Sequence, residues 1–247
     1  MATVKDIYNY IDSLAPFSTQ AEWDNSGFLV GDENKTVNKI IFALDVTTDV
    51  IEQAKNVCAD LIITHHPVIF KPVSNVLNDS LIYKLIENNI SIICAHTNYD
   101  KAVDGVNDIL CKTINVTNYE KVDGTFLNIA TFSYTYTTDE FANHLKDKLK
   151  GAIRYNNLNK SINKIAVCSG SGSDNLDLAK ELQCDALLTG DASHHSFLDA
   201  NEMDIVLFAA GHFETEMLAI KPLLERIEKE FKVDCVLAQQ NTPIITI

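Results

Sequence analysis

The chain has 247 residues, of which 46% are hydrophobic and 22% charged, and its formal net charge is −14. This length can bury a sizeable core, and the composition excludes an intrinsically disordered protein. The acidic balance argues against nucleic acid as a partner, because a negative surface repels phosphate backbones.

The N-terminal stretch "MATVKDIYNYIDSL" is amphipathic and has no apolar core of the kind found in signal peptides. No stretch approaches the roughly 20 apolar residues of a membrane span. The six cysteines are scattered without any Cys-x-x-Cys pair, which favours reduced, buried thiols over a zinc-cysteine site. We therefore expect a cytoplasmic protein without a membrane partner.

The first half of the chain alternates short apolar runs with helical patterns. The pattern predicts strands at 38–46, 60–66 and 91–96, and helices at 47–58, 78–89 and 104–113. Strands that are apolar on both faces and joined by helices indicate a parallel sheet covered by helices.

The middle segment differs, and the alternation then returns. We expect a half-exposed strand at 126–135, a helix at 139–150 and a short strand at 152–157. Further strands follow at 163–170, 185–190, 204–211 and 233–239, with helices at 175–183, 195–202 and 214–231, the last interrupted or kinked by Pro222. The fold class is thus α/β, with two related three-layer units, residues 1–124 and 125–247, expected to face one another.

Histidines and acids recur where predicted parallel strands end. His65 and His66 follow "LIIT", His96 and Asp100 follow "IICA", and His212 and Glu216 follow "LFAAG", while His194 and His195 come after "LLTGDAS". In open parallel sheets, ligands bind outside the carboxyl ends of the strands. These residues are therefore the candidate site.

Each pair has an ordinary interpretation as well as a chemical one. His65 and His66 can face one site only if the strand ends between them and turns, which Pro67 favours by restricting the backbone. Otherwise they are two imidazoles bonded to backbone groups at a strand end. His212 and Glu216 are four residues apart and would share one helix face.

Taken together, these residue types predict a centre with two divalent cations about 3.5–4 Å apart. Imidazole and carboxylate suit zinc, manganese, iron or nickel. We expect Glu216 to bridge both ions, and the other ligands to divide between them, with His65 and Asp100 on one ion and His66 and His212 on the other. His96 would orient Asp100 or a water.

Several stretches resemble the NIF-three-like family (NGG-interacting factor three), also labelled GTP cyclohydrolase I type 2 homologues. The matching stretches are "EWDNSGFLVG", "LIITHHPVIF", "AHTNYDKAVDGVND", "VCSGSGSD", "LLTGDASHHSFLDA" and "AAGHFETE". The family's metal pattern falls on His65, His66, Asp100, His212 and Glu216. Tyr99 and Phe213 depart from the usual family residues, and neither is a ligand.

The resemblance implies a two-metal centre between two α/β domains, a toroidal homohexamer and a small-molecule substrate, possibly a nucleotide such as GTP. We expect a metal-dependent hydrolase in which Glu216 is catalytic and His96 or His195 moves protons. The alternative is a non-enzymatic metal-binding scaffold that acts through protein interactions.

Two further motifs stay open at this level. The Gly170–Gly172 turn could cradle a phosphate with its backbone N–H groups or be a plain turn. Ser193, His194 and His195 could line a substrate site or form a capped helix start.

Overall fold

The computed structural model describes residues 1–245 and divides the chain into two compact units. The first unit comprises Met1–Val103 and Ala219–Asn241, and the second comprises Asp104–Leu218 with 242–245. The expected domains, 1–124 and 125–247, differ from these units because the chain returns to the first unit after residue 218. The α/β class is confirmed in both units.

The first unit is built on a sheet with the strand order β1-β4-β3-β2-β11. Its four parallel strands are β2 (Lys39–Ala43), β3 (Leu61–Thr64), β4 (Ser91–Cys94) and β11 (Asp234–Leu237), and β1 (Gly27–Val30) is antiparallel to β4. All residues of β3 and β4 are buried, as expected for parallel strands covered on both faces.

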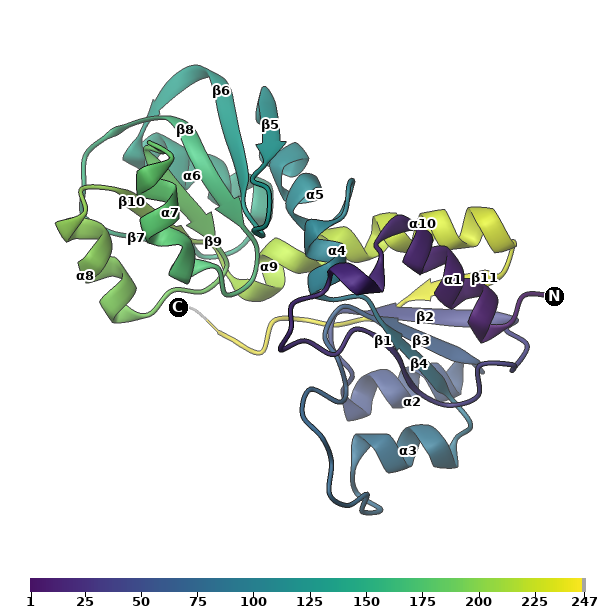
Figure 1. Cartoon of the computed structure of the whole chain (residues 1–247). Helices are drawn as coiled ribbons and strands as arrows, with labels where there is room; N and C mark the ends of the chain where they lie inside the picture. The colour runs from purple at the N-terminus through teal and green to yellow at the C-terminus, as the bar shows by residue number, and fades with distance from the viewer. Residues whose placement is uncertain (246–247) are drawn as a thin grey trace. The chain divides into compact units, whose positions relative to one another are not determined.

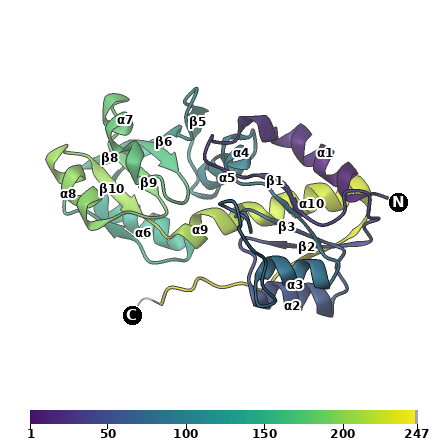
Figure 2. The ribbon, with the colours of Figure 1, turned by 60° about the horizontal axis from the view of Figure 1, so that its bottom comes forward.

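Helices cover both faces of this sheet. Helices α2 and α3 lie on one face, with α1 and α10 on the other (Figures 1 and 2). The helical segments are α1 (Val4–Leu14), η1 (Phe17–Thr19), α2 (Thr48–Asn56), α3 (Leu81–Glu87), α4 (Thr97–Lys101) and α10 (Ile220–Phe231). Thr3 begins α1 through a capping box with Asp6, which satisfies backbone donors at the start of the helix.

The second unit has a mixed sheet with the order β5-β6-β8-β9-β10-β7. Strands β8 (Ser161–Cys168), β9 (Ala186–Thr189) and β10 (Val206–Ala209) are parallel, and β5 (Asn118–Lys121), β6 (Asn128–Thr137) and β7 (Arg154–Tyr155) add antiparallel pairings. Both units therefore contain the parallel strand ends that the sequence predicts.

Two apolar clusters sandwich this second sheet. One contains residues of α5 (Val106–Thr113) and α6 (Thr138–Leu149), and the other contains residues of α7 (Leu176–Glu181) and α8 (His194–Glu202). The unit also contains η2 (Ser173–Asn175) and α9 (His212–Glu216). It is a three-layer α/β arrangement like the first unit.

The predicted helix at 214–231 is interrupted. It forms α9, the 3₁₀ turn η3 (Met217–Ala219) and α10. Pro222 lies in the first turn of α10, where its missing N–H removes no intrahelical hydrogen bond. Among the residues that the structure describes, no helix is long and apolar enough to cross a membrane.

Candidate metal centre

The strand carrying the histidine pair ends two residues earlier than the predicted strand 60–66, so it stops before both histidines. β3 stops at Thr64, so His65 and His66 lie beyond the regular alternation of side chains. The two rings have centroids 5.1 Å apart, which places both on one side of the turn. β4 ends in the same way at Cys94, two residues before His96.

His65, His66 and His96 form a cluster at the carboxyl ends of β3 and β4. The ring centroid of His96 lies 5.0 Å from that of His65 and 5.4 Å from that of His66. One ring nitrogen from each of the three lies within 4.8 Å of the other two. Three imidazoles from two strand ends thus converge on one point of the first unit.

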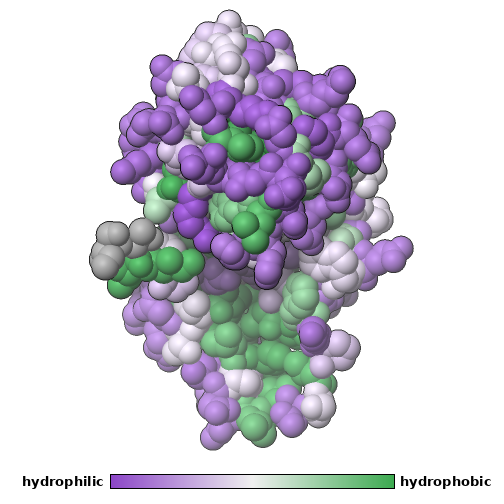
Figure 3. Space-filling model, turned by 90° about the vertical axis from the view of Figure 1, so that its left-hand side faces the viewer, coloured by the Kyte–Doolittle hydropathy of each residue, from purple (hydrophilic) through white to green (hydrophobic). Residues whose placement is uncertain are grey.

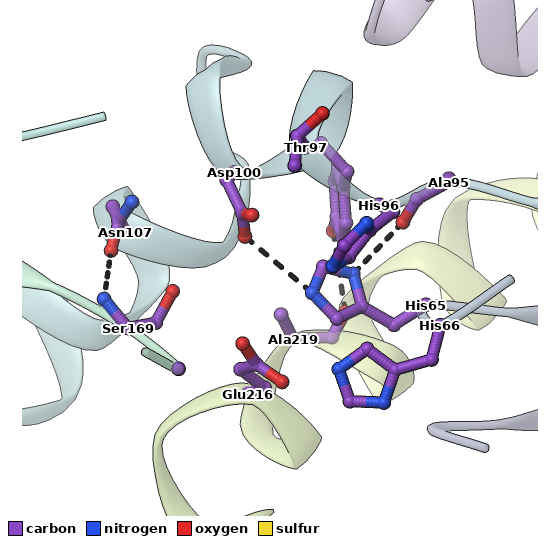
Figure 4. A network of polar contacts seen from close by, with 12 residues as sticks. His65, His66, Ala95, His96, Thr97, Asp100, Asn107, Ser169, Glu216 and Ala219 are labelled. Carbon is purple, nitrogen blue, oxygen red and sulfur yellow. Dashed lines mark hydrogen bonds and ion pairs between the residues drawn. The ribbon is translucent and has the colours of Figure 1, made fainter. Parts of the chain in front are cut away.

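The Nδ1 atom of every imidazole in this cluster contacts an oxygen. His65 Nδ1 lies 2.8 Å from the carbonyl of Ala95, as Figure 4 shows. His66 Nδ1 lies 2.7 Å from a carboxylate oxygen of Asp45, and His96 Nδ1 lies 2.8 Å from one of Asp24. An Nδ1–H that donates to oxygen leaves Nε2 with the lone pair that a metal needs.

Asp100 lies next to this cluster on the short helix α4. Its Oδ1 is 3.5 Å from His65 Nε2, and the His65 side chain is fully buried (Figure 4). α4 begins directly after His96, so one turn of chain supplies both an imidazole and a carboxylate. His65 and Asp100 thus lie side by side in the first unit.

Asp24 anchors the loop that precedes β1. Burial raises its pKa, but hydrogen bonds from His96, Thr97 and Ser26 outweigh burial and hold the pKa of Asp24 well below its usual range. The carboxylate therefore stays charged at neutral pH and fixes the orientation of the His96 ring.

The second unit carries the other predicted ligands, His212 and Glu216, on α9. His212 Nε2 lies 3.0 Å from Glu216 Oε2, and its Nδ1 lies 2.7 Å from Asp191. Glu216 is buried, and four-residue spacing on the helix brings the two side chains together as expected. Asp191 follows β9, so this imidazole also has a carboxylate behind it.

The Gly170–Gly172 turn makes room for this carboxylate. Gly170 has φ +58, and a Cβ there would lie 2.1 Å from Glu216 Oε1 and 3.3 Å from His212 Nε2. Its N–H donates to the Thr215 hydroxyl at 3.2 Å. A glycine is needed at position 170 because the Glu216 carboxylate approaches the backbone there too closely for any side chain. The sequence alone does not reveal this contact.

The donor set fits divalent cations in each unit. The first unit offers imidazole nitrogens together with the Asp100 carboxylate, and the second offers His212 with Glu216. Such mixtures suit zinc, iron, manganese or nickel, whereas magnesium and calcium prefer oxygen ligands. The oxygens behind the Nδ1 atoms match the outer partners typical of histidines that bind metals.

Sequence reasoning missed the three carboxylates that hold the imidazoles, Asp24, Asp45 and Asp191. A signal was present for two of them, since Asp191 directly follows the predicted strand 185–190 and Asp45 is an acid near the end of the predicted strand 38–46. Of the remaining candidates, Ser193 accepts the Ser196 N–H and caps α8, which confirms the capped helix start. His194 and His195 are exposed in the first turn of that helix.

Comparison with known proteins agrees with this architecture. The model of the Duf34/NIF3 (NGG1p interacting factor 3) family matches residues 2–243. A Clostridium acetobutylicum protein named GTP cyclohydrolase 1 type 2 homolog is 36% identical, over 98% of this chain and 94% of its own length. A Helicobacter pylori protein named GTP cyclohydrolase 1 type 2 is 31% identical, over 87% of this chain and 88% of its own.

A solved structure shows the same fold over the whole chain. A Staphylococcus aureus protein superposes with a TM-score of 0.92 at 28% identity, covering 99% of each chain. The chain therefore belongs to the Duf34/NIF3 family.

Proposed function

We propose that this protein is a metal-dependent hydrolase with a centre of two divalent cations. The ligands are the five residues expected from the sequence, His65, His66, Asp100, His212 and Glu216. The observation that carries the proposal is that His65, His66 and His212 each have an oxygen against Nδ1, which prepares Nε2 for a metal.

In this proposal these five residues would together hold the two ions. Two such cations would lower the pKa of water toward neutrality and so supply a nucleophile for hydrolysis. Side chains of the protein would hold the reacting groups in position and transfer protons. Asp24 holds the His96 ring in place, and His96 or His195 passes a proton between water and the leaving group.

The name of the relatives suggests the substrate class. Two of them carry the name GTP cyclohydrolase 1 type 2, with or without the word homolog. For GTP, one water would add to C8 of the guanine ring and open the imidazole ring to a formamide, and a second water would hydrolyse that formamide and release formate. We further propose that the protein acts in the cytoplasm and assembles as a homohexamer. Measuring the mass of the native protein tests the homohexamer.

Metal analysis tests the centre itself. We expect about two equivalents of zinc, iron, manganese or nickel in the purified protein and a strong loss in His65→Ala. His194→Ala is the matched control, because His194 is exposed on α8 and outside the ligand set. Equal metal content in wild type and His65→Ala would refute the centre.

Turnover separates the enzyme from a scaffold. The exposed apolar residues after β3, among them Val73 and Leu77, favour a second function in protein interaction. Metal-loaded protein is therefore incubated with GTP and a panel of phosphoesters, with Glu216→Gln as the inactive control. Activity that survives this substitution contradicts the proposed centre, and no turnover on any substrate favours the scaffold.

A further inference from the structure

Two large aromatic side chains of the first unit face solvent together. Trp23, the single tryptophan of the chain, is 59% exposed, and Phe70 is 46% exposed. Their ring centroids lie 5.8 Å apart with 45° between the planes. Other aromatic residues of this unit, such as Phe42 and Tyr99, are buried. Two large aromatic side chains exposed side by side are therefore a candidate binding surface.

The backbone under this aromatic pair is tied in place. The Asn25 side chain donates to the carbonyl of Ile69 at 2.6 Å, which links the segment of Trp23 to that of Phe70. Asp24 accepts from the N–H of Thr97 at 3.1 Å and contacts the His96 ring. Both aromatic residues therefore lie next to residues held by side-chain hydrogen bonds, which restricts where the two rings can be before a ligand binds.

The pair also lies beside the histidine cluster. The Trp23 ring meets the His96 ring edge-on, with centroids 6.0 Å apart and 72° between the planes. His96 in turn lies 5.0 Å from His65, ring centroid to ring centroid. A ligand ring on Trp23 would therefore have its reacting atoms near the imidazoles.

We propose that Trp23 and Phe70 bind the planar heteroaromatic ring of the substrate, a purine nucleoside, and hold it next to the histidine cluster. The inference rests on the proposed function, since it names what that centre acts on. Every nucleobase has an apolar π-face that stacks on an aromatic side chain, whereas a sugar phosphate lacks one. The two residues select the substrate by its ring and take no part in bond making.

A second copy of the chain is an alternative occupant of this surface, and the experiment must distinguish it from a nucleoside. Figure 3 shows a broad apolar area on the lower part of the face turned toward the viewer. Phe70 belongs to a loop that also exposes Val73, Val76 and Leu77. A second copy of the chain could cover this loop, and it would then bury Trp23 without any ligand.

Intrinsic fluorescence tests the proposal. Trp23 is the only tryptophan of the sequence, so the tryptophan emission measures changes at this side chain alone. Zinc-loaded protein is titrated with guanosine and, separately, with ribose 5-phosphate, which has no aromatic ring. We expect saturable quenching by guanosine alone. Phe70→Ala should weaken guanosine binding by about 5–150-fold, as expected for the loss of one stacking partner.

Matched variants isolate the aromatic contribution. Leu77→Ala removes a 59% exposed apolar side chain from the same loop and should leave guanosine affinity unchanged. Trp23→Ala, followed by calorimetry, should lose affinity as Phe70→Ala does, and Trp23→Phe should restore part of it. Circular dichroism confirms that each variant is folded.

The outcomes distinguish this inference from the proposed function. Normal zinc content without quenching by guanosine overturns the aromatic site and leaves the metal centre standing. Quenching in protein that binds no zinc supports the aromatic site and removes the hydrolase proposal. If Trp23 fluorescence changes with protein concentration but not with added guanosine, a second copy of the chain covers this surface. That result overturns the inference.

Discussion

Replacing Gly170 with alanine tests whether this turn exists to admit the Glu216 carboxylate. A Cβ at Gly170 would lie 2.1 Å from Glu216 Oε1, whereas ordinary van der Waals contact begins at 3.4 Å. The carboxylate must therefore move by roughly 1.3 Å, the difference between 2.1 and 3.4 Å. Metal–ligand distances tolerate only about 0.2 Å, so Glu216 would leave its coordinating position.

The substitution also has a backbone cost that has to be separated from the clash. Gly170 has a positive φ, where alanine loses about 1–2 kcal/mol relative to its usual conformations. Gly124 provides the control, because its φ is +75 and a Cβ there would meet nothing within 4 Å. Gly124→Ala therefore carries the backbone cost alone.

The assay combines urea unfolding with zinc titration of both variants. We expect both to lose about 1–2 kcal/mol of unfolding free energy, and only Gly170→Ala to lose at least about tenfold in zinc affinity. Zinc affinity equal in the two variants would refute the role of this glycine as the space for Glu216.

Three further predictions concern the carboxylates and one helix cap. Asp45→Asn should weaken zinc binding by about 10–100-fold in a titration, because His66 loses its charged partner, while exposed Asp49→Asn on α2 should change nothing. The pKa of Asp24 is lowered on folding, so its contribution to stability is present above about pH 4, the unfolded value, and is lost as the pH falls below it. Unfolding midpoints of Asp24→Asn should accordingly show a weaker fall between about pH 4 and pH 2 than wild type, and an equal fall contradicts the assignment. Thr137→Ala breaks the capping box that begins α6 and should cost about 1 kcal/mol in urea unfolding, whereas an unchanged midpoint would show that the cap is not needed.

Local patterns were enough to predict the strand ends that carry the candidate ligands. Apolar β-branched runs at 61–64 and 91–94 are buried parallel strands, and the histidines follow them as expected. The reason is physical: a parallel strand covered on both faces needs a continuous apolar run, so its end is visible where polar residues begin. The five-residue ligand set itself stays a prediction until metal is measured.

Features that depend on distant partners were not visible in the sequence. Asp24 contacts His96 across 72 positions of the chain, and no local pattern marks such a pair. The division at residue 124 failed to anticipate that β11 joins β2, because strand pairing between remote segments is set by the fold as a whole. The sequence around Gly170 could equally be a plain turn, because the contact that requires glycine there is with Glu216, which is distant in the chain.

The pairing of β11 with β2 has a consequence for biosynthesis. The ribosome delivers residues 104–218, with every strand of the second sheet, before β11, so the second sheet can form while the first is still incomplete. Until Asp234–Leu237 emerges, β2 is an open edge made of apolar residues, and nascent chains are most vulnerable to self-association in that interval.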